Sequence, residues 1–355
     1  MPSHTPNIAA ILKEAGGKIV TEERKTPSAG ANEIIIRNRA AAVNPIDWKR
    51  QSWNIMIASY PVILGSDVAG EVVEIGPGVT SLQVGDRVLA YSSGFITGNN
   101  DYTGFQTYSA VRSTSVAKIP DSMSFVEAAT LPQGVATATL TLFDVLGLPL
   151  PTGPRFSQAS ITEGSKASEH ALLVWGGSSS VGFQAIQIAL KTGITVFATA
   201  SKQHHEKLRE LGVAGVVDYK EETAVDDLTD LATKAGKQIT YAIDAITTVD
   251  TLNGVQGVLS KGTRTRKLAY STFWPDEGVE PLKDIVSGHL PGEDIMDRRD
   301  DLAKWLFNEA LPAWLEDKSL QQLPQTVVPG GLGGIQDALD ILQKGVSGSK
   351  VVVEV

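Results

Sequence analysis

A buried strand, a turn of very small residues and a helix follow one another in HALLVWGGSSSVGFQAIQIAL, residues 170–190. Two structures account for such a turn: a tightly packed strand–helix junction, or a loop whose backbone lies against the pyrophosphate of a dinucleotide. In the second, glycines let the phosphates approach, and the N–H groups and dipole of the helix N-terminus hold the anion. The turn comprises Gly176, Gly177, Ser178, Ser179, Ser180, Val181 and Gly182.

The segments that follow favour the dinucleotide. Further strands are predicted at ITVFATAS, AGVVDY, TYAIDAI and RKLAYST, and helices at residues 181–191 and around HHEKLRELG. Strands that alternate with helices indicate βαβ units and a parallel sheet, and continuous apolar runs are typical of its buried strands. We therefore predict an α/β fold with a Rossmann dinucleotide-binding domain, a doubly wound parallel sheet whose first turn holds the cofactor.

The first third of the chain is rich in strands of another kind. NEIIIRNRAAAVN, SDVAGEVVEIG and DRVLAYSS are runs of Val and Ile separated by turn residues, which indicate a mostly antiparallel, barrel-like domain. The segment FVEAATLPQGVATATLTLFDVL has helical spacing interrupted at Pro132, and GLPLPTGPRFSQASITEGSKAS is predicted to be an exposed loop. A last strand, KVVVEV, resembles those of the first domain and is expected to return to it.

The composition excludes several classes of function. The formal net charge of −9 over 355 residues argues against nucleic acid or a membrane surface as a partner, because both need a basic face. There is no cysteine, so disulfides, thiolate metal sites and Cys nucleophiles are ruled out. No apolar run approaches the ~18 residues of a membrane span, and the N-terminal one is too short for a signal peptide. We expect a cytoplasmic protein.

The end of the second predicted strand of the Rossmann domain bears on the choice of dinucleotide. An NAD site usually has an acid about 20 residues after the glycine turn, bonded to the ribose 2′-hydroxyl. The interval 177–205 contains no acid, and ITVFATAS leads into Ser201 and Lys202. A hydroxyl and a cation suit a 2′-phosphate, so NADPH is the predicted cofactor; the alternative is a solvated helix start.

Motifs along nearly the whole chain carry a resemblance to a known family. They are AAAVNPIDWKR, YPVILGSDVAGEVVEIGPGVTSLQVGDRV, AATLPQGVATA, LLVWGGSSSVGFQAIQIA, GVVDYKEE and SGSKVVVEV. These stretches resemble the zinc-free branch of the medium-chain dehydrogenase/reductase superfamily. NPIDWK, LGLPLP with its Pro/Ser-rich insertion, and YAIDAITTVDT are most similar to stand-alone enoyl reductases that serve fungal polyketide synthases in trans; quinone and alkenal reductases are also similar.

The resemblance implies a two-domain architecture and a type of reaction. A GroES-like catalytic domain is expected at residues 1–134 and 312–355, with the Rossmann NADPH-binding domain at 135–311 between its two parts. The zinc alcohol dehydrogenases of the superfamily have Cys and His as catalytic metal ligands, and here Asn44 and Ser66 stand at those positions. Without those ligands the Lewis-acid route to a carbonyl is missing, so we expect metal-independent reduction of a C=C bond.

That reaction sets requirements for the site. Hydride attacks the β-carbon of an α,β-unsaturated carbonyl, a hydrogen-bond donor must meet the charge that develops on oxygen, and a proton must reach the α-carbon. The resemblance places Asn44, Asp47 and Lys49 beside the nicotinamide. Lys49 is expected to donate to the enolate oxygen or to contact a substrate carrier; the alternative is a surface lysine paired with Asp47. Asn44 is expected to orient the nicotinamide or its ribose, and Trp48 and Phe273 to wall the substrate pocket.

The same resemblance implies five further cofactor contacts. Gln133 and Thr137 are expected at the nicotinamide end, Tyr219 at the adenosine ribose or its phosphate, and Ile246 at the nicotinamide ribose. Lys350 is expected to reach the cofactor from the last strand. The structural alternatives are a helix cap for Gln133 and Thr137, a strand-end tyrosine for Tyr219 and a solvated lysine for Lys350.

Three functions agree with these observations. The first is an NADPH-dependent reductase of an enone or a polyketide enoyl thioester, the latter carried on an acyl-carrier domain of a synthase. The second is a quinone reductase of the same fold, and the third is a structural protein that binds NADPH without turnover. A monomer or a homodimer is expected. Turnover of an enone separates the first from the third, and the reduced product separates the first from the second.

Overall fold

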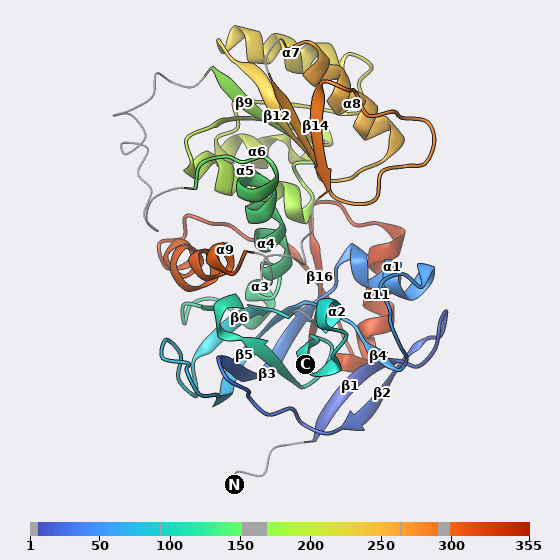
Figure 1. Cartoon of the computed structure of the whole chain (residues 1–355), viewed down its shortest axis with the longest axis vertical. Helices are drawn as coiled ribbons and strands as arrows, with labels where there is room; N and C mark the ends of the chain where they lie inside the picture. Colours follow the sequence, from blue (N-terminus) through green and yellow to red (C-terminus); the bar gives the residue numbers. More distant parts are fainter. Residues whose placement is uncertain (1–5, 93, 151–168, 263–264, 290–298) are drawn as a thin grey trace. The chain divides into compact units, whose positions relative to one another are not determined.

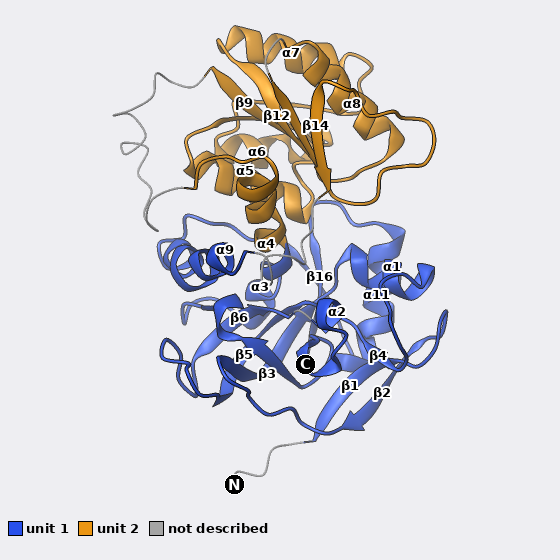
Figure 2. Ribbon diagram, viewed as in Figure 1, with its two compact units in different colours: residues 1–133, 293–355 blue, residues 134–292 orange. Residues whose placement is uncertain are grey.

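The computed structural model describes residues 6–92, 94–150, 169–262, 265–289 and 299–355 of the chain (Figure 1). The chain divides into two compact units, unit 1 with residues 1–133 and 293–355, and unit 2 with residues 134–292 (Figure 2). Most of the predicted exposed loop GLPLPTGPRFSQASITEGSKAS, from residue 151 to 168, lies outside the described residues. No helix in the described ranges is long and apolar enough to cross a membrane.

Unit 2 is built on a parallel sheet, as the alternating pattern predicts. In the described part of the chain its strand order is β11-β10-β9-β12-β13-β14, and every pair is parallel. This is the order of the Rossmann fold, so that prediction is confirmed. The strands are β9 (His170–Trp175), β10 (Thr195–Thr199), β11 (Gly215–Val217), β12 (Gln238–Asp244), β13 (Arg266–Tyr270) and β14 (Ile285–His289).

Helices connect the successive strands of this sheet from β9 to β13. The helices that follow β9, β10, β11 and β12 are α5 (Ser180–Lys191), α6 (His205–Leu211), α7 (Ala224–Lys234) and α8 (Val249–Ser260). Leu173, Phe197, Leu228 and Val255 belong to one buried cluster that joins α7 and α8 to the sheet. The strand order reverses between β9 and β12, which is where open α/β sheets bind ligands beyond the carboxyl ends of their strands.

Unit 1 is mostly antiparallel, as predicted for the first third of the chain. Its described strands form a small sheet, β2-β1-β4, and a larger one, β15-β16-β3-β5-β6-β8, with β7 paired to β3. The small sheet comprises β1 (Asn7–Leu12), β2 (Ile19–Arg24) and β4 (Val62–Ile63). The larger one comprises β3 (Glu33–Ala42), β5 (Asp67–Ile75), β6 (Arg87–Tyr91), β7 (Tyr108–Arg112), β8 (Val116–Lys118), β15 (Gln325–Val328) and β16 (Lys350–Glu354).

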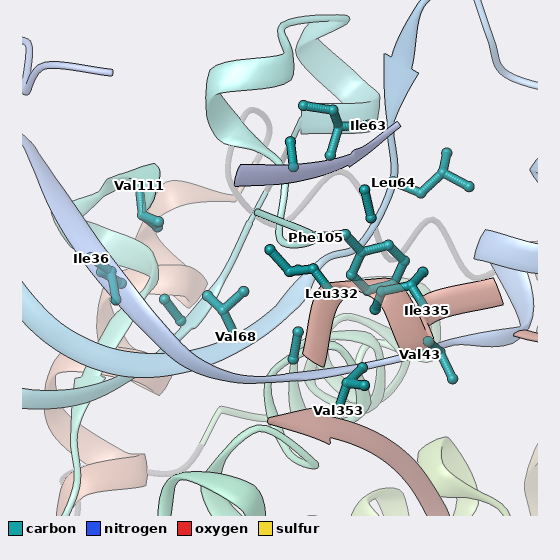
Figure 3. Close-up of a cluster of buried hydrophobic side chains, with 14 of the residues drawn as sticks. Ile36, Val43, Ile63, Leu64, Val68, Phe105, Val111, Leu332, Ile335 and Val353 are labelled. Carbon is teal, nitrogen blue, oxygen red and sulfur yellow. The ribbon is translucent and has the colours of Figure 1, made fainter. Parts of the chain in front are cut away.

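The two chain ends meet in the core of unit 1. The last strand, β16, pairs antiparallel with β3, so the predicted return of KVVVEV to the first domain is confirmed. Figure 3 shows Ile36 and Val68 from the N-terminal part of the chain in one cluster with Leu332, Ile335 and Val353 from its C-terminal part. Fully burying such a side chain contributes about 1.5–3 kcal/mol, so this cluster fixes β16 beside β3.

The helices of unit 1 are short, and one group of them bears on the domain boundary. They are α1 (Pro45–Trp53), α2 (Gly94–Thr97), α3 (Phe125–Ala128), α9 (Asp300–Lys304), α10 (Leu311–Glu316) and α11 (Ile335–Lys344), with a π-helical turn at Trp305–Ala310. The helical stretch from Asp300 to Ala310, assigned above to the Rossmann domain, groups with unit 1. Asn308 Nδ2 donates to the carbonyls of Ser113 (3.0 Å) and Val116 (2.9 Å), which ties it to β8.

Candidate functional site

The turn after β9 has the conformation that its glycines require. Gly176 has φ +83°, and a Cβ there would lie 2.7 Å from Ile246 Cγ1. A Cβ on Gly182 would lie 2.3 Å from the carbonyl oxygen of Gly176, closer than any side chain can approach backbone. Thr199 at the end of β10 fixes the start of the turn, since its Oγ1 accepts from Gly176 N at 3.0 Å and its carbonyl from Gly177 N at 2.8 Å.

The helix α5 begins directly after this turn, and the backbone N–H groups of its first turn have no helical acceptor. Ser179 caps the helix, and its Oγ accepts from Gly182 N at 3.1 Å. Ser178, Ser180 and Val181 are half-buried, and in the first turn of a helix no preceding carbonyl can accept from the N–H groups. Glycine backbone, N–H groups without a helical acceptor and nearby hydroxyls are what a pyrophosphate needs, so the residues present fit that group.

The helix α4 (Pro132–Leu140) carries two of the predicted cofactor residues. Thr137 is buried, at 6% exposure, and its carbonyl accepts from Thr141 Oγ1 at 2.6 Å. Within unit 2, a Cβ on Gly134 would lie 2.9 Å from Ser180 Oγ, so a small residue is needed for α4 to lie against the start of α5. Within unit 1, Gln133 donates its backbone N–H to Asp67 Oδ1 at 2.6 Å. The side-chain Oε1 of Gln133 is a buried acceptor with no partner among the described residues.

The structure brings Ser201, Lys202 and Tyr219 together beyond the carboxyl ends of β10 and β11. Ser201 Oγ donates to Tyr219 Oη at 3.3 Å. Lys202 Nζ lies 2.6 Å from Glu221 Oε1, and this hydrogen-bonded ion pair raises the pKa of Lys202. Glu221 was not predicted at this position, because it lies outside the interval 177–205 in which an NAD-binding acid is expected, on the loop that follows β11.

A buried carboxylate shapes the turn after β12, which lies beside the end of β9. Asp244 Oδ1 accepts from the N–H groups of Ile246 (3.0 Å) and Thr247 (2.9 Å), and Oδ2 accepts from Thr251 Oγ1 at 2.6 Å. Burial raises the pKa of Asp244, and these hydrogen bonds oppose that rise. Thr247 has φ +59°, a conformation that a β-branched residue adopts only when its surroundings hold it there. These bonds fix the turn, in which the side chain of Ile246 lies beside Gly176 and is 44% exposed.

In unit 1, Asp47 fixes the start of α1. Its Oδ2 accepts from Asn44 N at 2.8 Å, and its Oδ1 accepts from Gly65 N at 3.1 Å. Asp47 is 1% exposed, and burial raises its pKa from 3.8 to about 6. Both oxygens thus engage backbone groups, and the ion pair with Lys49 given above as an alternative does not form among the described residues.

Asn44 and Lys350 belong to a buried network centred on Asp67. Lys350 Nζ lies 2.8 Å from Asp67 Oδ2, and Asn44 Nδ2 donates to the same oxygen at 2.9 Å. Lys350 Nζ also donates to Asn44 Oδ1. Lys350 is 3% exposed and Asp67 is fully buried. The network therefore engages both polar ends of the Asn44 amide, and it directs the Lys350 ammonium into the interior of unit 1.

Lys49 lies against two indole rings on α1. Its Nζ is 5.9 Å from the ring centroid of Trp48 and 5.4 Å from that of Trp53, and the two rings meet edge to face at 5.3 Å. Partial burial lowers the pKa of Lys49. The rings hold the ammonium by cation–π attraction and leave its hydrogens available as donors.

A cavity of about 470 Å³ lies in unit 1 beside α1. Its wall combines apolar and polar side chains. It includes the buried cation Arg50, whose guanidinium lies 5.5 Å from the ring centroid of Phe95. Trp48 is outside this wall and packs on the core of unit 1. Phe273 lies in unit 2, 62% exposed and stacked on His289 at 5.8 Å. The residues around the cavity are Arg50, Met56, Ile57, Ala58, Ser59, Pro61, Val62, Gly94, Phe95, Ile96, Thr97, Gly98 and Asn100.

The raised pKa of Asp47 predicts a pH dependence of stability. Since the folded chain binds this proton more tightly than the unfolded chain, the stabilisation is complete below pH ~4 and is lost as the pH rises through about 6. The loss amounts to about 3 kcal/mol in the free energy of unfolding. We expect Asp47→Asn to remove this contribution in urea unfolding measured from pH 4 to 7. Parallel curves for wild type and variant would contradict the assignment.

Comparisons with known proteins agree with this architecture. Residues 30–121 match the alcohol dehydrogenase GroES-like domain. The trans-enoyl reductase himH of Aspergillus japonicus is 35% identical over 91% of this chain and 90% of its own length. The trans-enoyl reductase tndF of Aspergillus flavipes is 36% identical over 97% of this chain and 98% of its own. In fold, the chain is similar to the crystal structure of CurK enoyl reductase, with a TM-score of 0.76, 20% identity and 99% of both chains covered.

Proposed function

The chain belongs to the medium-chain dehydrogenase/reductase superfamily, close to the fungal trans-enoyl reductases, and from that premise we propose that it is an NADPH-dependent enoyl reductase. It is an oxidoreductase, and the family uses a nicotinamide dinucleotide. The proposed reaction is metal-independent reduction of the C=C bond of an α,β-unsaturated carbonyl, with a polyketide enoyl thioester as substrate. The observation that carries the proposal is the similarity over nearly the full length to proteins named trans-enoyl reductases.

In this proposal the cofactor is held by three groups of residues. The glycine–serine turn from Gly176 to Gly182 binds the pyrophosphate, and Ser201, Lys202 and Tyr219 bind the 2′-phosphate. Ile246, Gln133 and Thr137 hold the nicotinamide end, where the free acceptor Oε1 of Gln133 suits a carboxamide N–H. When bound, NADPH supplies the hydride.

The buried network changes the proposed roles of two residues. Asn44 and Lys350 have their polar atoms engaged with each other and with Asp67. We therefore propose that they position the start of α1, with no contact from Lys350 to the cofactor. Asp47 acts in the same way, through its bonds to the backbone of Asn44 and Gly65.

Lys49 is the proposed donor to the substrate. Its ammonium would meet the charge that develops on the carbonyl oxygen, and partial burial strengthens such a bond because the local dielectric is low. The cavity beside α1, whose wall combines apolar side chains with polar ones such as Arg50 and Asn100, would take the acyl chain. An acyl-carrier domain would deliver the thioester, and the enzyme would act as a monomer or a homodimer.

Lys49→Met should lower kcat for an enoyl thioester by about 100- to 1,000-fold, the cost of removing one donor to a developing oxyanion. The dissociation constant for NADPH should stay unchanged, because the proposal gives Lys49 a role toward the substrate and its Nζ lies against the rings of Trp48 and Trp53. Lys261→Met, an exposed lysine of unit 2, is the control and should keep wild-type kcat. Equal kcat for both variants would remove Lys49 from the mechanism.

The function itself is tested with the purified chain, NADPH, and a panel of enoyl thioesters, free enals and quinones. We expect oxidation of NADPH with the thioesters and recovery of the saturated thioester by mass spectrometry. Turnover of quinones alone would identify a quinone reductase, and binding of NADPH without turnover of any acceptor would support the structural role. Addition of EDTA should leave the rate unchanged.

A further inference from the structure

Lys202, the cation proposed to bind the 2′-phosphate, forms an ion pair with the acidic side chain of Glu221. Lys202 Nζ lies 2.6 Å from Glu221 Oε1, and the two side chains are 73% and 49% exposed. Ser201 and Tyr219 are the other proposed phosphate ligands, and their side chains are hydrogen-bonded to each other beside this ion pair. The pair therefore lies at the rim of the proposed phosphate site.

Three other charged residues, Asp218, Lys220 and Glu222, lie on the same loop as Glu221, and the charge of Asp218 adds to the rise in the pKa of Lys202. Asp218 is 8% exposed, and its Oδ1 accepts from Lys220 N at 3.1 Å. Lys220 Nζ lies 5.8 Å from the ring centroid of Tyr219. Glu222 is exposed. Glu221 is thus the carboxylate that pairs directly with Lys202 in the described part of the chain.

We infer that Glu221 sets the selectivity between NADPH and NADH, by competing with the 2′-phosphate for the ammonium of Lys202. This inference rests on the proposed NADPH site. An exposed ion pair contributes little to stability, so a phosphate dianion can displace the carboxylate. The displaced carboxylate stays on the same short loop, where it repels the phosphate and weakens binding. A ligand that lacks the 2′-phosphate does not displace the carboxylate from Lys202 and is not repelled by it.

The test measures binding by isothermal titration calorimetry with the full chain, and its probes are 2′,5′-ADP and 5′-AMP. Glu221→Gln should tighten 2′,5′-ADP by about 3- to 10-fold at low salt and leave 5′-AMP unchanged. Lys202→Met should weaken 2′,5′-ADP by about 10-fold or more, and in the double variant the Glu221→Gln gain should vanish. Glu222→Gln is the matched control, an exposed neighbouring acid that should give wild-type affinity for both probes.

The outcomes separate this inference from the proposal beneath it. If the wild-type chain binds 2′,5′-ADP no more tightly than 5′-AMP, the NADPH assignment is wrong and the inference falls with it. If it prefers 2′,5′-ADP but Glu221→Gln equals Glu222→Gln, the site stands and the role of Glu221 is overturned. Weaker binding of 5′-AMP by Glu221→Gln would also overturn it, because the carboxylate would then be a ligand of the ribose hydroxyl.

Discussion

Lys350→Met should lower the free energy of unfolding by about 3–5 kcal/mol, the cost of leaving a buried carboxylate without its partner. Lys350 and Asp67 are 3% and 0% exposed, so water cannot replace the lost ammonium. The network also reaches Gln133 N and the Asn44 amide, so the loss would loosen both the start of α1 and the start of β16. Urea unfolding followed by tryptophan fluorescence measures the change.

Two variants make this result specific. Lys13→Met breaks an exposed pair with Glu22, whose side chains are 56% and 45% exposed, and should cost under about 1 kcal/mol. The double variant Lys350→Met with Asp67→Asn should recover part of the loss, because the unpaired charge is then gone. Equal costs for Lys350→Met and Lys13→Met would show that the buried pair contributes no more than a surface pair.

Gly182→Ala should weaken NADPH binding by at least about 100-fold. The added Cβ would lie 2.3 Å from the carbonyl oxygen of Gly176, so the turn must move, and several N–H bonds to phosphate oxygens would be lost together. Binding is measured by the fluorescence of the reduced nicotinamide. Gly257→Ala is the matched control: it lies in α8 of the same unit, and its Cβ would come no closer than 3.4 Å to Val225, an ordinary contact. Wild-type affinity in Gly182→Ala would argue against a phosphate at this turn.

The features that could be predicted are those encoded in short, continuous stretches. β9, α5 and β10 follow from apolar runs, a helical repeat and a glycine turn, and β16 follows from its likeness to the strands of unit 1. α1 was not predicted, because PIDWKRQSW has little apolar periodicity and its start is fixed by Asp47 bonds to Asn44 and Gly65. β14 was not predicted either, because IVSGH is short and contains a glycine.

The candidate site also contains both local features, which the sequence predicts, and contacts between distant residues, which it does not. The turn from Gly176 to Gly182 is local, so its conformation could be anticipated from residue size alone. The contact of Lys350 with Asp67 joins residues 283 apart in the sequence, and no spacing rule predicts which buried carboxylate a lysine will reach. The pair of Glu221 and Lys202 is a second example, over a shorter separation in the sequence. The two side chains meet because β10 and β11 are neighbours in the sheet.

The most direct test of the central claim follows the hydride itself. The purified chain is incubated with an enoyl thioester and NADPH that carries deuterium at C4 of the nicotinamide, prepared separately as each of its two stereoisomers. We expect the deuterium from one of the two isomers to appear on the β-carbon of a saturated thioester, located by mass spectrometry or NMR. Consumption of NADPH without deuterium on carbon, or recovery of the unchanged enoyl thioester with both isomers, would contradict the proposed enoyl reductase activity.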